Sequence, residues 1–556
     1  MLVKKATVPN RRSNPANREE RQMAKKAKVT LHPSYKIGGI SPRLFGAFLE
    51  PISSMVNGCM YNPKHPLADD KGFRRDFMDG LKKANLPCVR LPGGNFVSGW
   101  RWKDSIGPVA QRKKHLDMAW FQYIPNDVGH DEYLEWAERA GTEPLYTINL
   151  GTGDINEAID IVEYTNFEGG TYWSDLRAKY GHPKPYNVKT WYLGNEVDGP
   201  WQIGSYEKDP RAYGILCHET SKAMKWTSPG IETVACVSSS PFLTHYPDWD
   251  RQVLEECYDT VDYISLHHYH SAPPGNTGAL MAGAQPFENY IQTEIALSDY
   301  IATKRRVRKK MMLSFDEFDN FFHPEGVSRY GMNGYLPIES YYSFDPEKKY
   351  IFHDPDDWST HSSRLPNDEM PIALANASTF LTFIRHADRV KIGCATSGLD
   401  MLCATNREHV WKGTSFHPLT HLIRFAKGLS LTPVVECETY DVDGYAIDQL
   451  QQYAGFEKVP YIQSAAAMNE ETGELNVFII NCDWEAPCEF TLDVRGFEGY
   501  EFVEHITLYS ETPGVSNSYE NPNAIVPMMD RNTKCSNGML TAVLNKQSWN
   551  VLRFRK

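Results

Sequence analysis

Short apolar runs alternate with amphipathic segments from about residue 42 to about residue 429. Strand-like runs that end in polar or glycine-rich turns occur in ANLPCVRLPGG, EPLYTINLGTG, VKTWYLGNEV, VDYISLHHYH, KKMMLSFDEF and RVKIGCATSG. Between them, apolar residues recur with helical spacing in DEYLEWAERAG, INEAIDIVEYTNF, RAYGILCHETSKAMKW and EMPIALANASTFLTFIRHA. Repeated strand–helix units of this kind predict an α/β fold with a parallel sheet.

Polar residues stand where these predicted strands end. They are Arg90 with Asn95, Asn149, Asn195 with Glu196, His267 with Tyr269, and Asp316 with Glu317. In a (β/α)8 TIM barrel the ends of all the strands meet on one face, so this arrangement favours such a barrel over residues 42–429. A doubly wound open sheet is the alternative, but it would carry a phosphate-binding glycine fingerprint after its first strand, and LPGGNF does not match one.

The pattern changes after about residue 430. Short strand-like runs are separated there by Gly, Asn, Asp and Pro turns, and helical spacing is nearly absent. This predicts a β-sandwich over residues 430–556, and the strand in AKVTLHPSY is expected to bring residues 23–41 into it. Residues 1–22 are basic and polar, which predicts a disordered tail, with Met23 as an alternative start of the chain.

A long connection rich in Tyr, Phe, Pro and Asp runs from residue 323 to residue 367. Loops of this length in compact domains are usually either functional or disordered. Disordered segments contain few aromatic residues. The composition therefore favours an ordered lid or the wall of a binding subsite.

Composition and charge narrow the class of protein. The 556 residues exceed what one small core needs, so two domains are expected. A net charge of −12 disfavours nucleic acid or an anionic membrane as a partner, and no stretch is long and apolar enough to span a bilayer. Eleven scattered cysteines without a CxxC pair indicate a reducing compartment, so we expect a cytoplasmic protein. An aromatic content of 12% fits either a large core or stacking on sugar rings.

Two glutamates occupy equivalent places at strand ends. Glu196 follows WYLGN and Glu317 follows MMLSFD, so in a barrel both side chains lie on the same face. Glycosidic bond cleavage uses such a pair, because one acid protonates the departing oxygen while the other attacks or stabilises the anomeric carbon. Each glutamate could instead form an ion pair with a barrel arginine. The loop after Glu196 carries Trp201 and Gln202, which is more aromatic and amide surface than a solvated loop usually holds.

Several motifs together make a family recognisable. WYLGNEVDGPWQIG, RLFGAFLEPISSMVNGCMYNP, VRLPGGNFVSGWRWKDSIGP, INLGTGDINEAIDIVEYTN and SNSYENPNAIVP closely resemble α-L-arabinofuranosidases of glycoside hydrolase family 51, and the likeness runs from about residue 28 to the end. The resemblance implies a retaining enzyme with a (β/α)8 barrel and a jelly-roll-like β-sandwich, without a cofactor. It also implies an intracellular homo-oligomer (trimer or hexamer) that acts on arabinose-containing oligosaccharides.

The same resemblance implies roles for individual residues. Glu196 matches the general acid/base, Glu317 matches the nucleophile, and Asn195 matches the asparagine that binds the sugar 2-hydroxyl. The other substrate-binding positions that it implies are Glu50, Arg90, Asn95 and Tyr269, with Trp100 and Trp102 as candidate walls of the pocket. Two of these have simpler alternatives, because Arg90 could be an ion-pair partner in the core and Trp100 could serve packing alone.

The HHYH sequence at residues 267–270 does not favour a metal site. His267 and His268 are adjacent, so on a strand they point to opposite faces, and His268 and His270 lack an obvious third ligand nearby. We therefore expect no metal. We also expect Asp316 to support the site structurally rather than to react.

The chain departs from the family pattern at a few positions near the predicted site. The usual DEW-N-x-W reads DEFDNFF here, with Phe318 for the tryptophan and Asp319 for the asparagine, and Gly413, after Lys412, stands where a glutamine is usual. These changes leave open the same retaining mechanism on another furanoside, a xyloside, or an internal glucan or xylan linkage. A catalytically silent carbohydrate-binding protein is a further hypothesis, which the presence of both glutamates disfavours.

Overall fold

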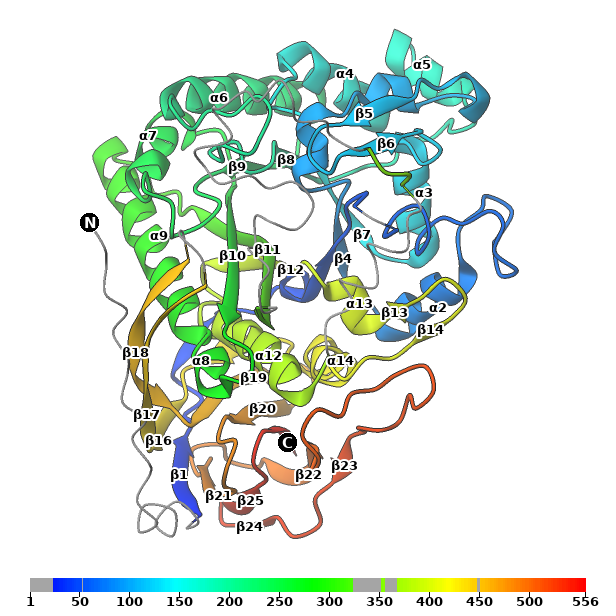
Figure 1. Cartoon of the computed structure of the whole chain (residues 1–556). Helices are drawn as coiled ribbons and strands as arrows, with labels where there is room; N and C mark the ends of the chain where they lie inside the picture. Colours follow the sequence, from blue (N-terminus) through cyan, green and yellow to red (C-terminus); the bar gives the residue numbers. More distant parts are fainter. Residues whose placement is uncertain (1–23, 53, 324–351, 356–367, 448–450) are drawn as a thin grey trace, which may run out of the picture.

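The computed structural model describes residues 24–52, 54–323, 352–355, 368–447 and 451–556 (Figure 1). The predicted tail at residues 1–22 lies outside the described residues, and so does most of the predicted lid at residues 323–367. No helix in the described part of the chain is long and apolar enough to cross a bilayer.

Eight parallel strands close into a barrel, which confirms the prediction of a (β/α)8 TIM barrel. In order around the barrel they are β3 (Gly46–Phe48), β4 (Cys88–Leu91), β7 (Glu143–Ile148), β8 (Thr190–Leu193), β9 (Glu232–Cys236), β10 (Tyr263–Ala272), β11 (Met312–Phe322) and β12 (Val390–Ala395). Side chains fill the barrel interior and helices cover its outside, so the strands are buried on both faces. This is why they appear in the sequence as continuous apolar runs.

Helices follow the strands and form the outer wall (Figure 1). They are α2 (Arg75–Ala84), α3 (His130–Ala140), α4 (Ile155–Asn166), α5 (Tyr172–Lys179), α6 (Pro210–Thr227), α7 (Asp248–Cys257), α8 (Thr277–Met281), α9 (Ala284–Arg305), α12 (Met370–Arg385), α13 (Gly398–Leu402) and α14 (Phe416–Phe425). Asp154 and Asp209 each accept a hydrogen bond from a backbone N–H in the helix that follows, which fixes where α4 and α6 begin. α12 is buried along nearly its whole length because it packs against both β11 and β19 (Ile462–Asn469).

Strands from residues 25–39 and from residue 429 onwards form two mainly antiparallel sheets, which confirms the predicted β-sandwich. One sheet has the order β16 (Val434–Cys437), β1 (Lys25–Thr30), β21 (Cys488–Asp493), β25 (Met539–Leu544), β24 (Lys534–Ser536). The other has the order β2 (Lys36–Gly39), β15 (Leu429–Leu431), β19, β20 (Glu474–Asn481), β26 (Ser548–Arg555), β22 (Glu501–Leu508), β23 (Met528–Met529). Val29, Leu492 and Leu552 belong to the apolar core of this region. The predicted boundary between residues 429 and 430 falls within β15 and stays a prediction.

Two hairpins outside these large sheets position the site. The strands β5 (His115–Asp117) and β6 (Gln122–Ile124) pair with each other, and so do β17 (Thr439–Ala446) and β18 (Gln452–Pro460). The β17–β18 hairpin reaches from the sandwich towards the barrel, beside α8 (Figure 1). The remaining short elements are β13 (Ala404–Thr405), β14 (Val410–Trp411) and the 3-10 helices Pro42–Phe45, Asn95–Gly99, Trp102–Ser105 and Val109–Gln111.

Candidate active site

The two predicted catalytic glutamates lie together at one end of the barrel. Glu196 is in the loop that follows β8, and Glu317 lies within β11. One carboxylate oxygen of each lies within 4.8 Å of the other, and a ring nitrogen of His267 lies within the same distance of both. A retaining glycosidase needs its carboxyl groups about 5–5.5 Å apart, whereas an inverting enzyme needs about 6.5–9.5 Å to admit a water molecule. The spacing therefore fits double displacement.

Arg90, on β4, connects the two glutamate-bearing segments. Its Nη1 donates to Glu317 Oε1 at 2.7 Å, and its Nη2 donates to Asn195 Oδ1 at 2.7 Å. Its Nε lies 3.0 Å from Asp316 Oδ2, and the side chain is fully buried. Burial opposes the positive charge, but the negative charges of Asp316 and Glu317 outweigh it and raise the pKa of Arg90. Arg90 is thus an ion-pair partner, and its partners are the site residues themselves.

His267, on β10, lies between three carboxylates. Its Nδ1 is 2.9 Å from Glu196 Oε1 and 3.7 Å from Glu317 Oε2, and its Nε2 is 3.2 Å from Asp316 Oδ2. Burial alone would lower the pKa of His267, but the charges of Glu317 and Asp316 and the hydrogen bonds with Asp316 and Glu196 raise it to about 10. The imidazole is therefore protonated near neutral pH and donates from both nitrogens.

Glu196, His267 and Glu317 are close enough together to coordinate a cation. A metal-ligating imidazole is neutral, so a metal ion here would have to displace a proton from His267, whose pKa the carboxylates raise. The imidazolium and Arg90 already supply positive charge to the carboxylates. The arrangement fits proton transfer and charge stabilisation better than metal binding.

Asp316 remains ionised within the same network. Burial alone would raise its pKa, but the charges of Arg90 and His267 lower it. Ser265 Oγ also donates to Asp316 Oδ2 at 2.9 Å. Since Asp316 contacts the groups that hold Glu196 and Glu317, its position fits the supporting role that we predicted for it.

Tyr269 lies two residues beyond His267 on the same face of β10. Its hydroxyl donates to Glu317 Oε2 at 2.8 Å and lies 2.9 Å from Thr396 Oγ1. With Arg90 on Oε1, both oxygens of Glu317 are held by hydrogen bonds. The carboxylate is thereby fixed in one orientation.

Asn195 and the loop behind Glu196 form a second hydrogen-bonded group. Asn195 Nδ2 donates to Asn95 Oδ1 at 2.9 Å, and the side-chain amide of Gln202 donates to the same oxygen. Trp201 Nε1 donates to Glu196 Oε2 at 2.8 Å. The Trp-Gln pair that follows Glu196 in the sequence thus holds the predicted acid/base and its neighbours.

Glu196 itself has an unusual backbone conformation and a shifted acidity. Its φ is +43°, in the left-handed region that costs a non-glycine residue free energy and is often found at functional sites. Burial raises the pKa of Glu196, and the negative charge of Glu317 raises it further, while the hydrogen bond with His267 opposes the rise. A carboxyl group that keeps its proton towards neutral pH can act as a general acid.

Glu50 follows β3, the barrel strand between β12 and β4, and lies close enough to Glu317 to feel its charge. Its Oε1 accepts hydrogen bonds from Phe96 N at 3.0 Å and from Trp120 Nε1 at 2.6 Å. A Cβ at Gly94 would lie 2.1 Å from Glu50 Cδ, and Gly94 has φ +82°, so this close approach requires glycine. Burial raises the pKa of Glu50 well above its usual range, and the charge of Glu317 adds to the effect.

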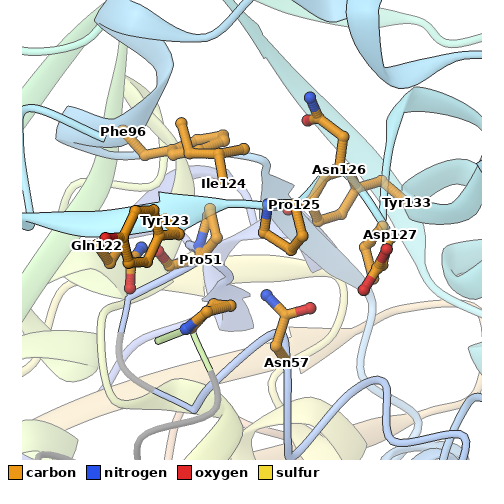
Figure 2. Close-up of a pocket in the computed structure, with 12 residues that line it drawn as sticks. Pro51, Asn57, Phe96, Gln122, Tyr123, Ile124, Pro125, Asn126, Asp127 and Tyr133 are labelled. Atoms are coloured by element: carbon orange, nitrogen blue, oxygen red, sulfur yellow. The ribbon is translucent and has the colours of Figure 1, made fainter. Parts of the chain in front are cut away.

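The β5–β6 hairpin carries Trp120 to Glu50, and residues of β6 and of the segment that follows it line a pocket. Figure 2 shows this pocket, which Pro51, Phe96 and Gln122 help to line. Part of the predicted lid is described here: His353 N donates to Phe121 O at 2.8 Å, and Tyr123 N donates to His353 O at 3.0 Å. Residues 352–355 therefore pair with the hairpin, while the remainder of residues 324–367 lies outside the described residues.

Trp100 and Trp102 are buried among other aromatic residues, and their role as walls of the pocket stays a prediction. Trp100 packs against Phe96 and Tyr133, and its Nε1 donates to Asn126. Trp102 packs against the aromatic rings His130, Tyr164 and Trp173 of α3, α4 and α5. The tryptophans that touch site carboxylates are Trp120 and Trp201.

The departures from the family pattern fall in three different surroundings. Phe318 is fully buried against Phe287, Phe380 and Phe383, on the face of β11 opposite to Glu317, so it does not border the sugar site. Asp319 Oδ2 accepts from Ser397 N at 3.2 Å. A Cβ at Gly413 would lie 2.3 Å from Asp368 Oδ2, so Asp368 fills the space that a longer side chain at 413 would need.

Comparison with known sequences also relates this chain to α-L-arabinofuranosidases, over most of its length. Residues 80–292 match the α-L-arabinofuranosidase 1 domain, and residues 356–548 match the α-L-arabinofuranosidase C-terminal domain. A protein of Bacillus subtilis (strain 168) named intracellular exo-α-(1→5)-L-arabinofuranosidase 1 is 36% identical over 537 residues, which cover 96% of this chain and 99% of the relative. A protein of Acetivibrio thermocellus named intracellular exo-α-(1→5)-L-arabinofuranosidase is 35% identical over 96% of this chain and 100% of the relative.

Solved structures share the complete architecture. A family 51 α-L-arabinofuranosidase from Bifidobacterium longum superposes with a TM-score of 0.79 at 27% identity, covering 96% of this chain and 100% of that one. An α-L-arabinofuranosidase from Thermotoga maritima in an arabinose complex superposes with a TM-score of 0.78 at 26% identity, with the same coverage of 96% and 100%. The chain belongs to the α-L-arabinofuranosidases of glycoside hydrolase family 51.

Proposed function

We propose that this protein is a retaining exo-glycosidase that releases terminal α-L-arabinofuranosyl residues from arabinose-containing oligosaccharides. The observation that carries the proposal is the spacing of Glu196 and Glu317, whose nearest oxygens lie within 4.8 Å of each other at the strand ends. Two full-length relatives bear names that specify an exo-acting α-(1→5)-L-arabinofuranosidase. We propose the same α-(1→5) linkage for this chain.

Glu317 is the nucleophile in the first half of the reaction. Its carboxylate oxygen attacks the anomeric carbon, the bond to the leaving oxygen breaks, and Glu196 gives that oxygen its proton. Arg90 and Tyr269 orient Glu317 through its two oxygens. Asn195 is placed to hydrogen-bond the sugar 2-hydroxyl, a contact that strengthens as charge develops at the anomeric carbon.

The second half reverses the role of Glu196. As a carboxylate it takes a proton from water, whose oxygen attacks the anomeric carbon and releases Glu317. The sugar leaves with its original anomeric configuration, and both glutamates return to their starting protonation states. Trp201 and His267 orient Glu196 through its two oxygens.

A panel of 4-nitrophenyl furanosides and pyranosides tests the substrate, and NMR of the first-formed product tests the stereochemistry. We expect the α-L-arabinofuranoside to react fastest, with retained configuration. Inversion would reject the mechanism, and faster turnover of a xyloside or of another furanoside would reject the sugar. Binding measured by calorimetry without release of any product would support a silent carbohydrate-binding protein instead.

The cellular setting is a second part of the proposal. The relatives are named intracellular, and the scattered cysteines, which form no disulfide in the described part of the chain, fit a reducing compartment. We therefore propose that the enzyme acts in the cytoplasm, in L-arabinose metabolism. The resemblance to family 51 also implies a homo-oligomer. Gel filtration with light scattering tests the subunit number, and a monomer would reject the last point.

A further inference from the structure

β10 extends well beyond the neighbouring strand on one side. β9 pairs with it only at residues 263–265, whereas β11 pairs with it as far as Ala272. The segment that carries His267 and Tyr269 therefore has one edge that no described strand covers. Backbone N–H and C=O groups buried at such an edge need other partners, because an unpaired buried polar group is costly.

Side chains of the β17–β18 hairpin supply those partners. Gln451 Nε2, immediately before β18, donates to the backbone carbonyl of Tyr269 at 2.9 Å. Tyr445 Oη donates to Ser271 O at 3.1 Å, and Ser271 N donates to Tyr453 Oη at 3.4 Å. Since residues 269 and 271 face the same edge of the strand, the three side chains together replace the missing strand.

Aromatic packing holds the hairpin in this place. Tyr445 stacks on Tyr453 with ring centroids 4.7 Å apart, and His270 of β10 contacts both Tyr453 and Phe456 edge-on. Gln451 is only 2% exposed, so its side chain has little freedom to move away. The hairpin belongs to the sandwich half of the sequence, and its partner strand belongs to the barrel.

We propose that Gln451 is a positioning residue for the glycosidase reaction, through which the sandwich region sets the place of Tyr269 against the nucleophile. The inference rests on the proposed function, because it concerns how Glu317 is oriented. The hydroxyl of Tyr269 contacts Glu317 at 2.8 Å, and the peptide of the same residue is held by Gln451. A shift of that peptide moves the hydroxyl away from the carboxylate and leaves the sugar-binding groups Glu50 and Asn95 in place.

A double-mutant cycle with Tyr269→Phe tests the proposal. With the aryl glycoside that the wild-type enzyme hydrolyses fastest, we expect Gln451→Ala to lower kcat about tenfold and to change KM less than about twofold, since a misplaced Tyr269 hydroxyl disturbs the orientation of the nucleophile and so acts on the chemical step. In the Tyr269→Phe background, which lacks the hydroxyl, the same substitution should lower kcat by less than about twofold. Gln452→Ala is the matched control, because Gln452 is the neighbouring glutamine and is exposed.

Gln451→Met is the second variant, because it keeps about the size of the side chain and loses the donor. If Gln451→Ala does not fold, this variant carries the test, and a drop in kcat of about tenfold is expected for it as well. Unchanged kcat in both Gln451 variants, or an equal loss with and without the Tyr269 hydroxyl, would overturn the inference and leave the proposed function standing. Absence of turnover by the wild-type enzyme on every glycoside would overturn both.

Discussion

Buried carboxyl groups gather in two regions of the barrel, and the two regions differ in their partners. At the strand ends, Glu317 and Asp316 contact Arg90, and His267 lies between them and Glu196. Behind β9, Asp250 of α7 and Glu294 of α9 are also fully buried. Ser238 donates to Asp250 Oδ1, and Asp250 is hydrogen-bonded to Glu294, but neither acid forms an ion pair within the described part of the chain.

The comparison shows that partners, rather than burial, decide whether a buried acid is ionised. Burial raises the pKa of Asp250 to about 7, with a further rise from the negative charge of Asp198. Burial also raises the pKa of Glu294 well above its usual range, and the charge of Asp250 adds to that rise. Asp316 is buried to the same degree, yet the charges of Arg90 and His267 lower its pKa. At the active-site end Asp316 is ionised because two cations contact it, while Asp250 and Glu294, which have no such partner in the described part of the chain, hold protons more readily.

Among substitutions at the active-site end of the barrel, removal of the nucleophile should have the largest effect on activity. Glu317→Ala leaves Arg90 and His267 facing each other without the anion between them and removes the group that attacks the sugar. We expect kcat to fall at least about 10⁴-fold on aryl glycosides, measured by release of nitrophenol. Added azide should restore turnover with inverted product. Activity above about 1% of the wild-type value would mean that another residue is the nucleophile.

Replacing His267, one of the two cations at the active-site end, should have the next largest effect on activity. His267→Gln keeps a hydrogen-bond donor but removes the positive charge near Glu196, Asp316 and Glu317. We expect kcat to fall about 10²-fold, a loss of about 2.7 kcal/mol in transition-state stabilisation, measured by steady-state kinetics.

His268→Gln is the control for His267→Gln. His268 lies on the opposite face of β10 and packs against Phe242 and Phe287, so its loss should lower the thermal midpoint and leave kcat of the folded enzyme within about twofold. Equal losses of kcat in the two variants would contradict a special role for the charge at position 267.

The pH dependence of Glu196 should respond in a smaller and more specific way. Because burial and Glu317 raise the pKa of Glu196, the alkaline limb of kcat/KM should report loss of its proton, and it should disappear in Glu196→Gln. With 4-nitrophenol, a leaving group that needs little protonation, we expect kcat/KM to fall only about tenfold at neutral pH. A methyl or sugar leaving group should lose far more. An alkaline limb that persists in the variant would assign it to another acid.

Much of the fold was predictable because it depends on local patterns. The strand–helix alternation and the polar residues at strand ends predict the barrel, and strands between turn residues predict the sandwich. Glu196, Glu317, Arg90 and Asn195 follow from the same pattern, since residues at the ends of parallel strands must meet.

The remaining parts of the site depend on register and on distant segments. His267 appears in the sequence as one of three similar histidines, and only the pairing of β10 with β11 places it between Glu196 and Asp316. Trp120 lies on a hairpin whose strands have three residues each, too short to show a periodic pattern. Gln451 lies 182 residues after Tyr269, in a segment that the sequence assigns to the other domain. Trp201 and Gln202 are different, because the sequence does signal them: the loop after Glu196 carries more aromatic and amide surface than a solvated loop usually holds.

The pair behind β9 provides the smallest predicted effect and concerns stability. In the folded state Asp250 and Glu294 keep protons that the unfolded chain releases above about pH 4, so the free energy of unfolding should decrease as the pH rises from about 4 towards 7. Glu294→Gln removes one of these protons and places an amide donor beside Asp250. Its free energy of unfolding should therefore decline less between pH 5 and pH 8, by about 1–3 kcal/mol, in urea denaturation measured at both pH values.

Glu288→Gln, on the same helix as Glu294, should change the pH dependence of stability in the opposite direction. It therefore tests whether the charges around each glutamate, and not its place on α9, decide the effect. Burial alone would raise the pKa of Glu288, but the hydrogen bond with His386 and the charges of His386 and Arg385 lower it, so its contribution to stability is present above its unfolded pKa and is lost as the pH falls. The variant should be less stable than the wild-type protein at pH 8 and approach it at low pH. If Glu288→Gln and Glu294→Gln changed the free energy of unfolding by the same amount at pH 8, neighbouring cations would not explain how buried acids differ in this protein.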